Sequence, residues 1–111
     1  MAKKYIIVQT HTNKRRISIK IAEHLIADRL ASCVNIYTSA CSIYRYNNRI
    51  VRENEYLIHS KTTSDKFRAI EKLIGELHNY ETPEIIALEI FEGNKKYLEW
   101  IYNEINWAQT L

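Results

Sequence analysis

The 111-residue chain has the length of a single domain, and its 46% hydrophobic and 26% charged residues are typical of a globular protein with an ordinary buried core. Its formal net charge of +3 is spread along the chain, which argues against nucleic-acid binding, although a weak nucleic-acid-binding module stays an alternative. Two glycines are too few for a phosphate-binding loop, and no hydrophobic stretch approaches the roughly 18 residues that span a membrane.

The N-terminal part of the chain predicts a strand and a helix. Residues 5–8 form a continuous β-branched and hydrophobic run, which is typical of a strand buried on both faces, and polar residues 11–16 interrupt it. Hydrophobic residues then recur at a spacing of four. This spacing predicts an amphipathic helix that starts near Ile17 and ends near Ala31.

A hairpin with long arms is predicted next. Residues 33–46 read as one strand, residues 49–62 read as the returning strand, and Asn47 and Asn48 between them tolerate the positive φ of a two-residue turn. Each arm has about a dozen residues, or roughly 40 Å at about 3.3 Å per residue. Typical strands are about half as long.

The remaining residues predict a helix, a strand and a final helix. Residues 63–65 offer a hydroxyl cap followed by an acid, as at a helix start, and the hydrophobic face continues over residues 67–77. The helix ends before residues 79–83, because a proline disfavours helix in the residue before it. Residues 85–91 read as a strand, and residues 98–105 as a short helix.

This order of elements predicts one α+β domain over residues 1–111, with the ferredoxin-like split βαβ arrangement (β-α-β-β-α-β) and a C-terminal helix. The hairpin is too long for the sheet of one such domain, so its outer part would expose an edge and a hydrophobic surface, with Ile43 and several tyrosines on it. Pairing with neighbouring subunits in a closed ring would cover both. The alternative is a hairpin that curls over its own sheet.

Five segments, in order along nearly the whole chain, resemble those of the CutA (divalent-cation tolerance) family. They are ADRLASCVNI (27–36), SIYRY (42–46), HSKT (59–62), LHNYETPEIIALEI (77–90) and GNKKYLEWI (93–101). The resemblance implies a ferredoxin-like subunit, a tight homotrimer similar in assembly to the nitrogen-regulatory signalling trimers, and a non-enzymatic role in copper tolerance or the response to metal ions. The physiological ligand does not follow from the fold.

The family's copper ligands are only partly retained. In the family, copper binding has been attributed to a cysteine near the end of the first strand and to a histidine pair; here the corresponding positions hold Thr10, Leu77 and His78. His11 can supply a nitrogen instead, and Glu84 an oxygen. Because closed transition-metal sites use about four ligands, we expect copper or another divalent cation to bind only weakly. The alternatives are a helix-terminal role for His78 and a surface position for His11.

A binding role would instead use the clefts between subunits. Lys61, Tyr80 and Glu84 are polar residues next to strand ends, where they can meet a small ligand; equally, Lys61 and Glu84 can form a salt bridge that closes the interface.

One of the two cysteines and one of the four histidines leave an enzymatic alternative, a small hydrolase with Cys33 as nucleophile and His59 as base. Cys33 lies in a hydrophobic run where a buried, inert thiol is expected, and nothing in the sequence fixes the pair on one face, so we expect no enzyme. Residues 1–10 contain only a short hydrophobic run, so we expect no secretory signal. We therefore expect a cytoplasmic protein in which Cys33 and Cys41 stay reduced rather than form a disulfide.

Overall fold

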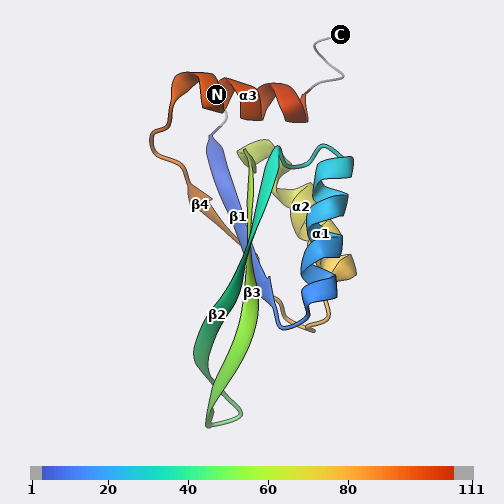
Figure 1. Ribbon diagram of the computed structural model, residues 1–111, viewed down its shortest axis with the longest axis vertical. Coiled ribbons are helices and arrows are strands. Elements are labelled where there is room, and N and C mark those ends of the chain that lie inside the picture. Colours follow the sequence, from blue (N-terminus) through green and yellow to red (C-terminus); the bar gives the residue numbers. More distant parts are fainter. Residues whose placement is uncertain (1–3, 107–111) are drawn as a thin grey trace.

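The computed structural model of the protein describes residues 4–106. Its elements are β1 (Tyr5–Thr12), α1 (Arg15–Ala27), β2 (Cys33–Tyr46), β3 (Arg49–Thr63), a 3₁₀ turn (Ser64–Lys66), α2 (Phe67–Leu77), β4 (Ile86–Glu89) and α3 (Lys95–Ile105). The strands form an antiparallel sheet in the order β2-β3-β1-β4. Helices α1 and α2 cover one face of the sheet, and α3 lies across its end (Figure 1). This confirms the predicted ferredoxin-like α+β fold.

The core lies between the sheet and the two covering helices. Alternate residues of β1 are buried, and they contact residues of β3, α1 and α2. The core residues are Ile6, Val8, Ile21, Leu25, Ala31, Ile58, Ile70 and Ile74. The other face of the sheet is open, so the expectation that β1 is buried on both faces is wrong within this subunit.

Several element boundaries differ from the prediction: β4 is shorter than residues 85–91, α3 begins before residue 98, and the ends of β1 and α1 differ for identifiable reasons. Strand β1 continues through the polar residues to Thr12, because Gln9 to Thr12 pair in register with β3. Helix α1 ends at Ala27, and Arg29 has a φ of 54° that stops helical hydrogen bonding. Leu30 still packs against the core, which explains why the hydrophobic spacing continued beyond the helix.

The hairpin turn is confirmed, since Asn47 and Asn48 have φ angles of 49° and 63°. A feature that the sequence did not predict is a β-bulge in β2 between Tyr37 and Ala40, with Ser39 at a φ of 67°. Bulges increase the local twist of a hairpin. The twisted hairpin projects away from the body instead of curling over its own sheet (Figure 1).

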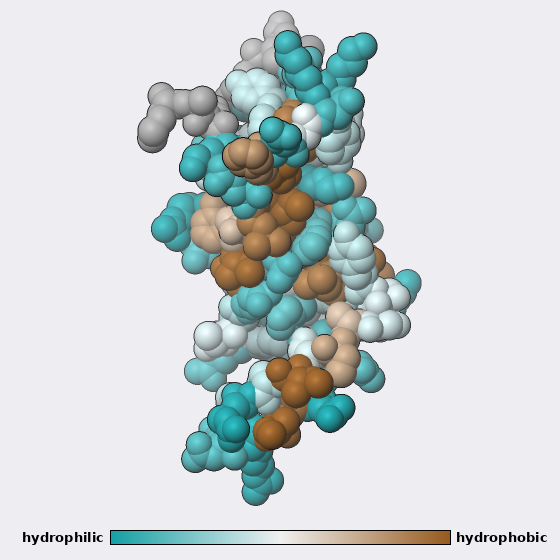
Figure 2. All heavy atoms as spheres, turned by 90° about the vertical axis from the view of Figure 1, so that its left-hand side faces the viewer, coloured by the Kyte–Doolittle hydropathy of each residue, from teal (hydrophilic) through white to brown (hydrophobic). Residues whose placement is uncertain are grey.

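Hydrophobic side chains remain exposed on the hairpin and on β4. Ile43 is 58% exposed and Ile50 is 69% exposed on the hairpin, and Ile86 and Leu88 are each 41% exposed on β4. Figure 2 shows separate hydrophobic patches on the body and on the projecting hairpin. In the described part of the chain, no helix is long and hydrophobic enough to cross a membrane.

Candidate cation site in the hairpin groove

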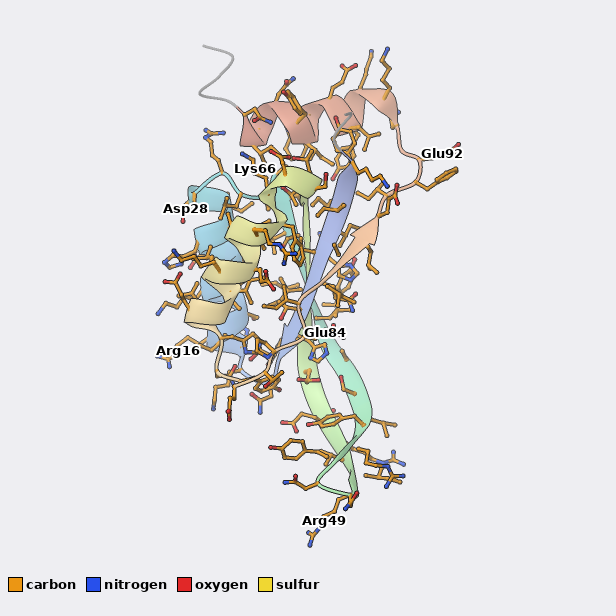
Figure 3. The ribbon with its side chains drawn as sticks, turned by 180° about the vertical axis from the view of Figure 1, so that it is seen from behind. Arg16, Asp28, Arg49, Lys66, Glu84 and Glu92 are labelled. Carbon is orange, nitrogen blue, oxygen red and sulfur yellow. The ribbon has the colours of Figure 1, made fainter. Side chains whose placement is uncertain are left out.

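A groove of about 920 Å³ lies where the hairpin leaves the body. One wall is the hairpin, the other is the loop between α2 and β4, and the end of β1 completes it. The lining residues are His11, Ser42, Ile43, Tyr44, Tyr46, Glu55, Asn79, Tyr80, Glu81, Thr82, Pro83 and Glu84. Figure 3 shows Glu84 at the level where the hairpin strands separate from the sheet. The groove therefore brings together three segments that are distant in sequence.

Glu55 is the buried acid of this groove, with 3% of its surface exposed. The Tyr80 hydroxyl donates a hydrogen bond of 2.5 Å to Glu55 Oε2, and His11 Nδ1 lies 3.1 Å from Oε1. Burial raises the pKa of the Glu55 carboxyl, but hydrogen bonds from Ser42 and Tyr80 and the charge of His11 outweigh it, so the net pKa is lowered. Glu55 is therefore ionised at neutral pH.

His11 lies between two carboxylates. Its Nδ1 faces Glu55, and its Nε2 lies 3.5 Å from Glu84 Oε2. Gln9 donates a hydrogen bond of 3.0 Å to that same oxygen, and its Oε1 lies 2.8 Å from His59 Nε2. Thus Glu84 is held in place by the neighbouring strand, and the sequence-predicted pair of His11 and Glu84 is brought together.

His78 has a different role from His11. Its Nε2 lies 2.9 Å from the His11 carbonyl oxygen, and its Nδ1 accepts a hydrogen bond of 3.0 Å from the Tyr80 N–H. Burial lowers the pKa of the His78 imidazole, which is neutral and donates from Nε2. Metal binding by His78 would require one of these hydrogen bonds to break.

The described residues do not bring a full set of metal ligands together. Between residues 4 and 106, no group of three or more His, Cys, Asp or Glu side chains is placed to hold one ion. Glu55 and Glu84 face opposite nitrogens of the His11 ring, so the three side chains do not converge on one point.

Lys61 lies away from the groove, at the end of the sheet near α3. It pairs with Ile7 and Cys33 in the sheet, and its Nζ lies 5.5 Å from the centre of the Tyr97 ring. Among the ion pairs of the described residues, none joins Lys61 to Glu84. Within one subunit, Tyr80 and Glu84 line the groove, and Lys61 does not join them.

The cysteines are both free, Cys33 half-buried and Cys41 exposed. The expectation of a buried Cys33 is thus wrong, because the Cys33 side chain lies on the open face of the sheet. The register places Cys33 and His59 on the same face, yet in the described part of the chain no hydrogen bond is found between them. Eight residues apart on one strand, Cys33 and Cys41 are separated by roughly 26 Å, too far for a disulfide within the chain.

Comparison with known proteins matches the chain to a single family. The model of the CutA1 divalent ion tolerance protein family matches residues 6–104. The divalent-cation tolerance protein CutA of Thermus thermophilus is 44% identical over 81 residues, which cover 73% of this chain and 79% of that protein. The chloroplastic CutA of Arabidopsis thaliana is 33% identical over 98 residues, covering 88% of this chain.

Solved structures agree with the sequence comparison. The divalent cation tolerance protein of Thermus thermophilus has a TM-score of 0.85 at 38% identity and covers 87% of this chain and 94% of that one. CutA1 from the psychrotrophic bacterium Shewanella has a TM-score of 0.88 at 33% identity and covers 94% and 97%. The chain spans only about half the length of the plant and animal relatives, 54% for Arabidopsis thaliana and 48% for Homo sapiens.

Proposed function

Because the chain belongs to the CutA1 divalent ion tolerance family, we propose that it acts as a non-enzymatic homotrimer in cytoplasmic divalent-cation tolerance, copper included. In this proposal one domain over residues 1–111 forms each subunit, and a cation binds weakly in the hairpin groove.

The observation that carries the proposal is the pairing of His11 Nε2 with Glu84 Oε2 at 3.5 Å, a separation at which both atoms can contact one ion. Glu55, on the opposite ring nitrogen, would orient the imidazole so that Nε2 stays available, as buried carboxylates do for metal-bound histidines. An imidazole nitrogen with a carboxylate oxygen suits Cu²⁺ or Zn²⁺. When bound, the ion would bring positive charge to a site that already holds two carboxylates.

The trimeric part of the proposal is supported by the exposed hydrophobic surface. Ile43, Ile50, Ile86 and Leu88 are exposed in the single subunit, and β4 and β2 are the edges of the sheet. Assembly would also allow Lys61 of one subunit to meet Tyr80 and Glu84 of another, either around a small ligand or as a salt bridge.

A non-enzymatic role is supported by the surroundings of Cys33. His59, the candidate base, has its Nε2 2.8 Å from Gln9 Oε1, and among the described residues no hydrogen bond joins it to the Cys33 thiol. The hydrolase and nucleic-acid alternatives have no comparable support in the family match.

Calorimetry with Cu²⁺ tests this proposal. We expect a dissociation constant on the order of micromolar, or about −8 kcal/mol, because one subunit supplies few ligands. The change His11→Gln should weaken binding about tenfold or more, since it removes the available nitrogen. His78→Ala should weaken binding only modestly, because the His78 nitrogens are already in hydrogen bonds.

The control is His24→Gln, which removes an exposed imidazole of α1 that lies outside the groove lining. It should leave the affinity unchanged. A single nanomolar site that disappears with His78→Ala would contradict the proposal.

A further inference from the structure

Gln9 links the cation site to the open face of the sheet. It lies on β1 between two direct sheet partners, His59 of β3 and Ile86 of β4. Its Nε2 donates a hydrogen bond of 3.0 Å to Glu84 Oε2, and its Oε1 lies 2.8 Å from His59 Nε2. Both ends of the amide are therefore occupied, each by a side chain from a different segment.

The chemistry of the two partners determines which end of the amide faces which. An ionised carboxylate only accepts hydrogen bonds, so Glu84 requires the NH₂ end of Gln9. The oxygen end is then left to His59, which must carry a proton on Nε2 in order to donate. A reversed amide would place two acceptor oxygens together at Glu84. In the observed arrangement, each contact pairs a donor with an acceptor.

The His59 ring is held in place and is neutral. The Tyr37 ring meets it edge to face, with 5.0 Å between the ring centroids and an interplanar angle of 75°. Burial and the positive charge of Lys61 lower the pKa of the His59 imidazole, so at neutral pH the ring carries one proton. The contact with Gln9 Oε1 places that proton on Nε2.

The Glu84 carboxylate depends on this support. Its side chain is 34% exposed, and among the described residues Gln9 is the one hydrogen-bond donor to its carboxylate. A long side chain with that exposure has other rotamers that reach solvent. The oxygen that Gln9 holds, Oε2, is the one that lies 3.5 Å from His11 Nε2, and it has a second lone pair for a cation. Holding Oε2 therefore keeps the two donors of the cation site together.

We propose that His59 is a positioning residue for the cation site, which acts through Gln9 and does not contact the ion. By donating to Gln9 Oε1, it holds the amide with its NH₂ group toward Glu84, and the carboxylate stays beside His11. Among the described residues that line the groove, His59 is absent. This role rests on the proposed function, because it concerns the orientation of one of the two proposed cation donors.

The first test is ¹H–¹⁵N NMR of the metal-free protein in EDTA. We expect one side-chain amide proton of Gln9 to lie downfield of the other, as a hydrogen bond to a carboxylate produces. The His59 ring should have a protonated Nε2 and an unprotonated Nδ1. In His59→Leu the downfield proton should move toward the position of a solvent-exposed amide. Exposed-type shifts for both Gln9 protons in the wild type would overturn the positioning role.

The second test is calorimetry with Cu²⁺. Gln9→Met removes the direct partner of Glu84 and should weaken binding about tenfold, whereas His59→Leu, one step further away, should weaken it several-fold. His59→Gln should bind like the wild type, because its amide can still donate to Gln9. If His59 were itself a ligand, His59→Gln would lose as much affinity as His59→Leu. The matched control His24→Leu removes an exposed imidazole of α1 and should change nothing.

A double-mutant cycle separates positioning from a general structural effect. In the Glu84→Gln background, His59→Leu should cause no further loss, because the carboxylate that it orients is gone. The same fold loss in both backgrounds would overturn the positioning role. If the wild type binds no Cu²⁺ but shows the expected Gln9 shifts, the proposed function fails and the orientation of Glu84 by His59 stands. If His59→Leu binds Cu²⁺ as tightly as the wild type, the positioning role alone fails.

Discussion

Light scattering of the purified protein at micromolar concentration is expected to give a mass of about 40 kDa, three times the 13.2 kDa of one chain. The hairpin exposes Ile43, Tyr46 and Ile50, at 58%, 65% and 69%, in a molecule 51 Å long. Exposed sheet edges and hydrophobic patches of this kind favour association. A closed ring of three subunits would cover them without leaving a free edge.

The hairpin patch can be tested directly with the double change Ile43→Lys and Ile50→Lys. These side chains lie on the same face of the hairpin, because Ile43 pairs with Arg52 and Ile50 with Arg45. Two buried ammonium groups would cost several kcal/mol at an interface, so we expect the mass to fall to that of a monomer. The control Ile26→Lys changes a residue of α1 that is 44% exposed and should leave the mass unchanged. A wild-type monomer at all concentrations would contradict the trimer.

The change Tyr80→Phe is expected to lower the free energy of unfolding by about 1.5–3 kcal/mol, the usual range for a hydrogen bond to a charged group. The change removes the hydroxyl that donates to Glu55 Oε2. The Glu55 side chain is 2% exposed, so its carboxylate stays buried with one hydrogen bond fewer. Urea denaturation at pH 7 and at one fixed protein concentration measures the effect. Tyr44→Phe is the matched control, since its hydroxyl donates a long, exposed hydrogen bond of 3.4 Å to half-buried Glu53, and it should leave the free energy of unfolding almost unchanged.

The same pair of variants should differ in their pH dependence. The pKa of Glu55 is lowered in the folded protein, so its contribution to stability is present above the unfolded pKa of 4.5 and is lost as the pH falls through the folded value. Tyr80→Phe removes one cause of the lowering, so the loss at acidic pH should be smaller than in the wild type. If Tyr80→Phe and Tyr44→Phe have the same small effect at every pH, then the Tyr80–Glu55 contact does not stabilise the protein.

The fold could be predicted because its signals are local. The helix periodicities of α1 and α2 and the Asn47-Asn48 turn each follow from neighbouring residues, and the order of elements then limits the topology. Among the boundaries that differed, the end of β1 at Thr12 depends on pairing with β3, and the end of α1 at Ala27 depends on the left-handed Arg29. Neither the strand pairing nor the backbone conformation of Arg29 can be predicted from the spacing of hydrophobic residues.

The groove could be predicted only in part. His11 and Glu84 were candidates, but Glu55 was not, because a single acid in a strand reads as a solvent-facing residue. Its two oxygens are covered by Tyr80, from the loop after α2, and by His11, from the end of β1, and the sequence does not place these residues together. The two hydrogen bonds that occupy His78 likewise come from a strand end and a loop, which the sequence does not place together.

The central claim, a divalent cation bound by His11 and Glu84, is tested most directly by the ring ¹⁵N chemical shifts of the four histidines during titration with Zn²⁺. Coordination changes the shift of the nitrogen that binds the ion. We predict that His11 Nε2 shifts progressively, that the His78 nitrogens keep the shifts of a neutral ring with a protonated Nε2, and that Glu84→Gln reduces the change at His11. A coordination shift at His78, with His11 unchanged, would contradict the account.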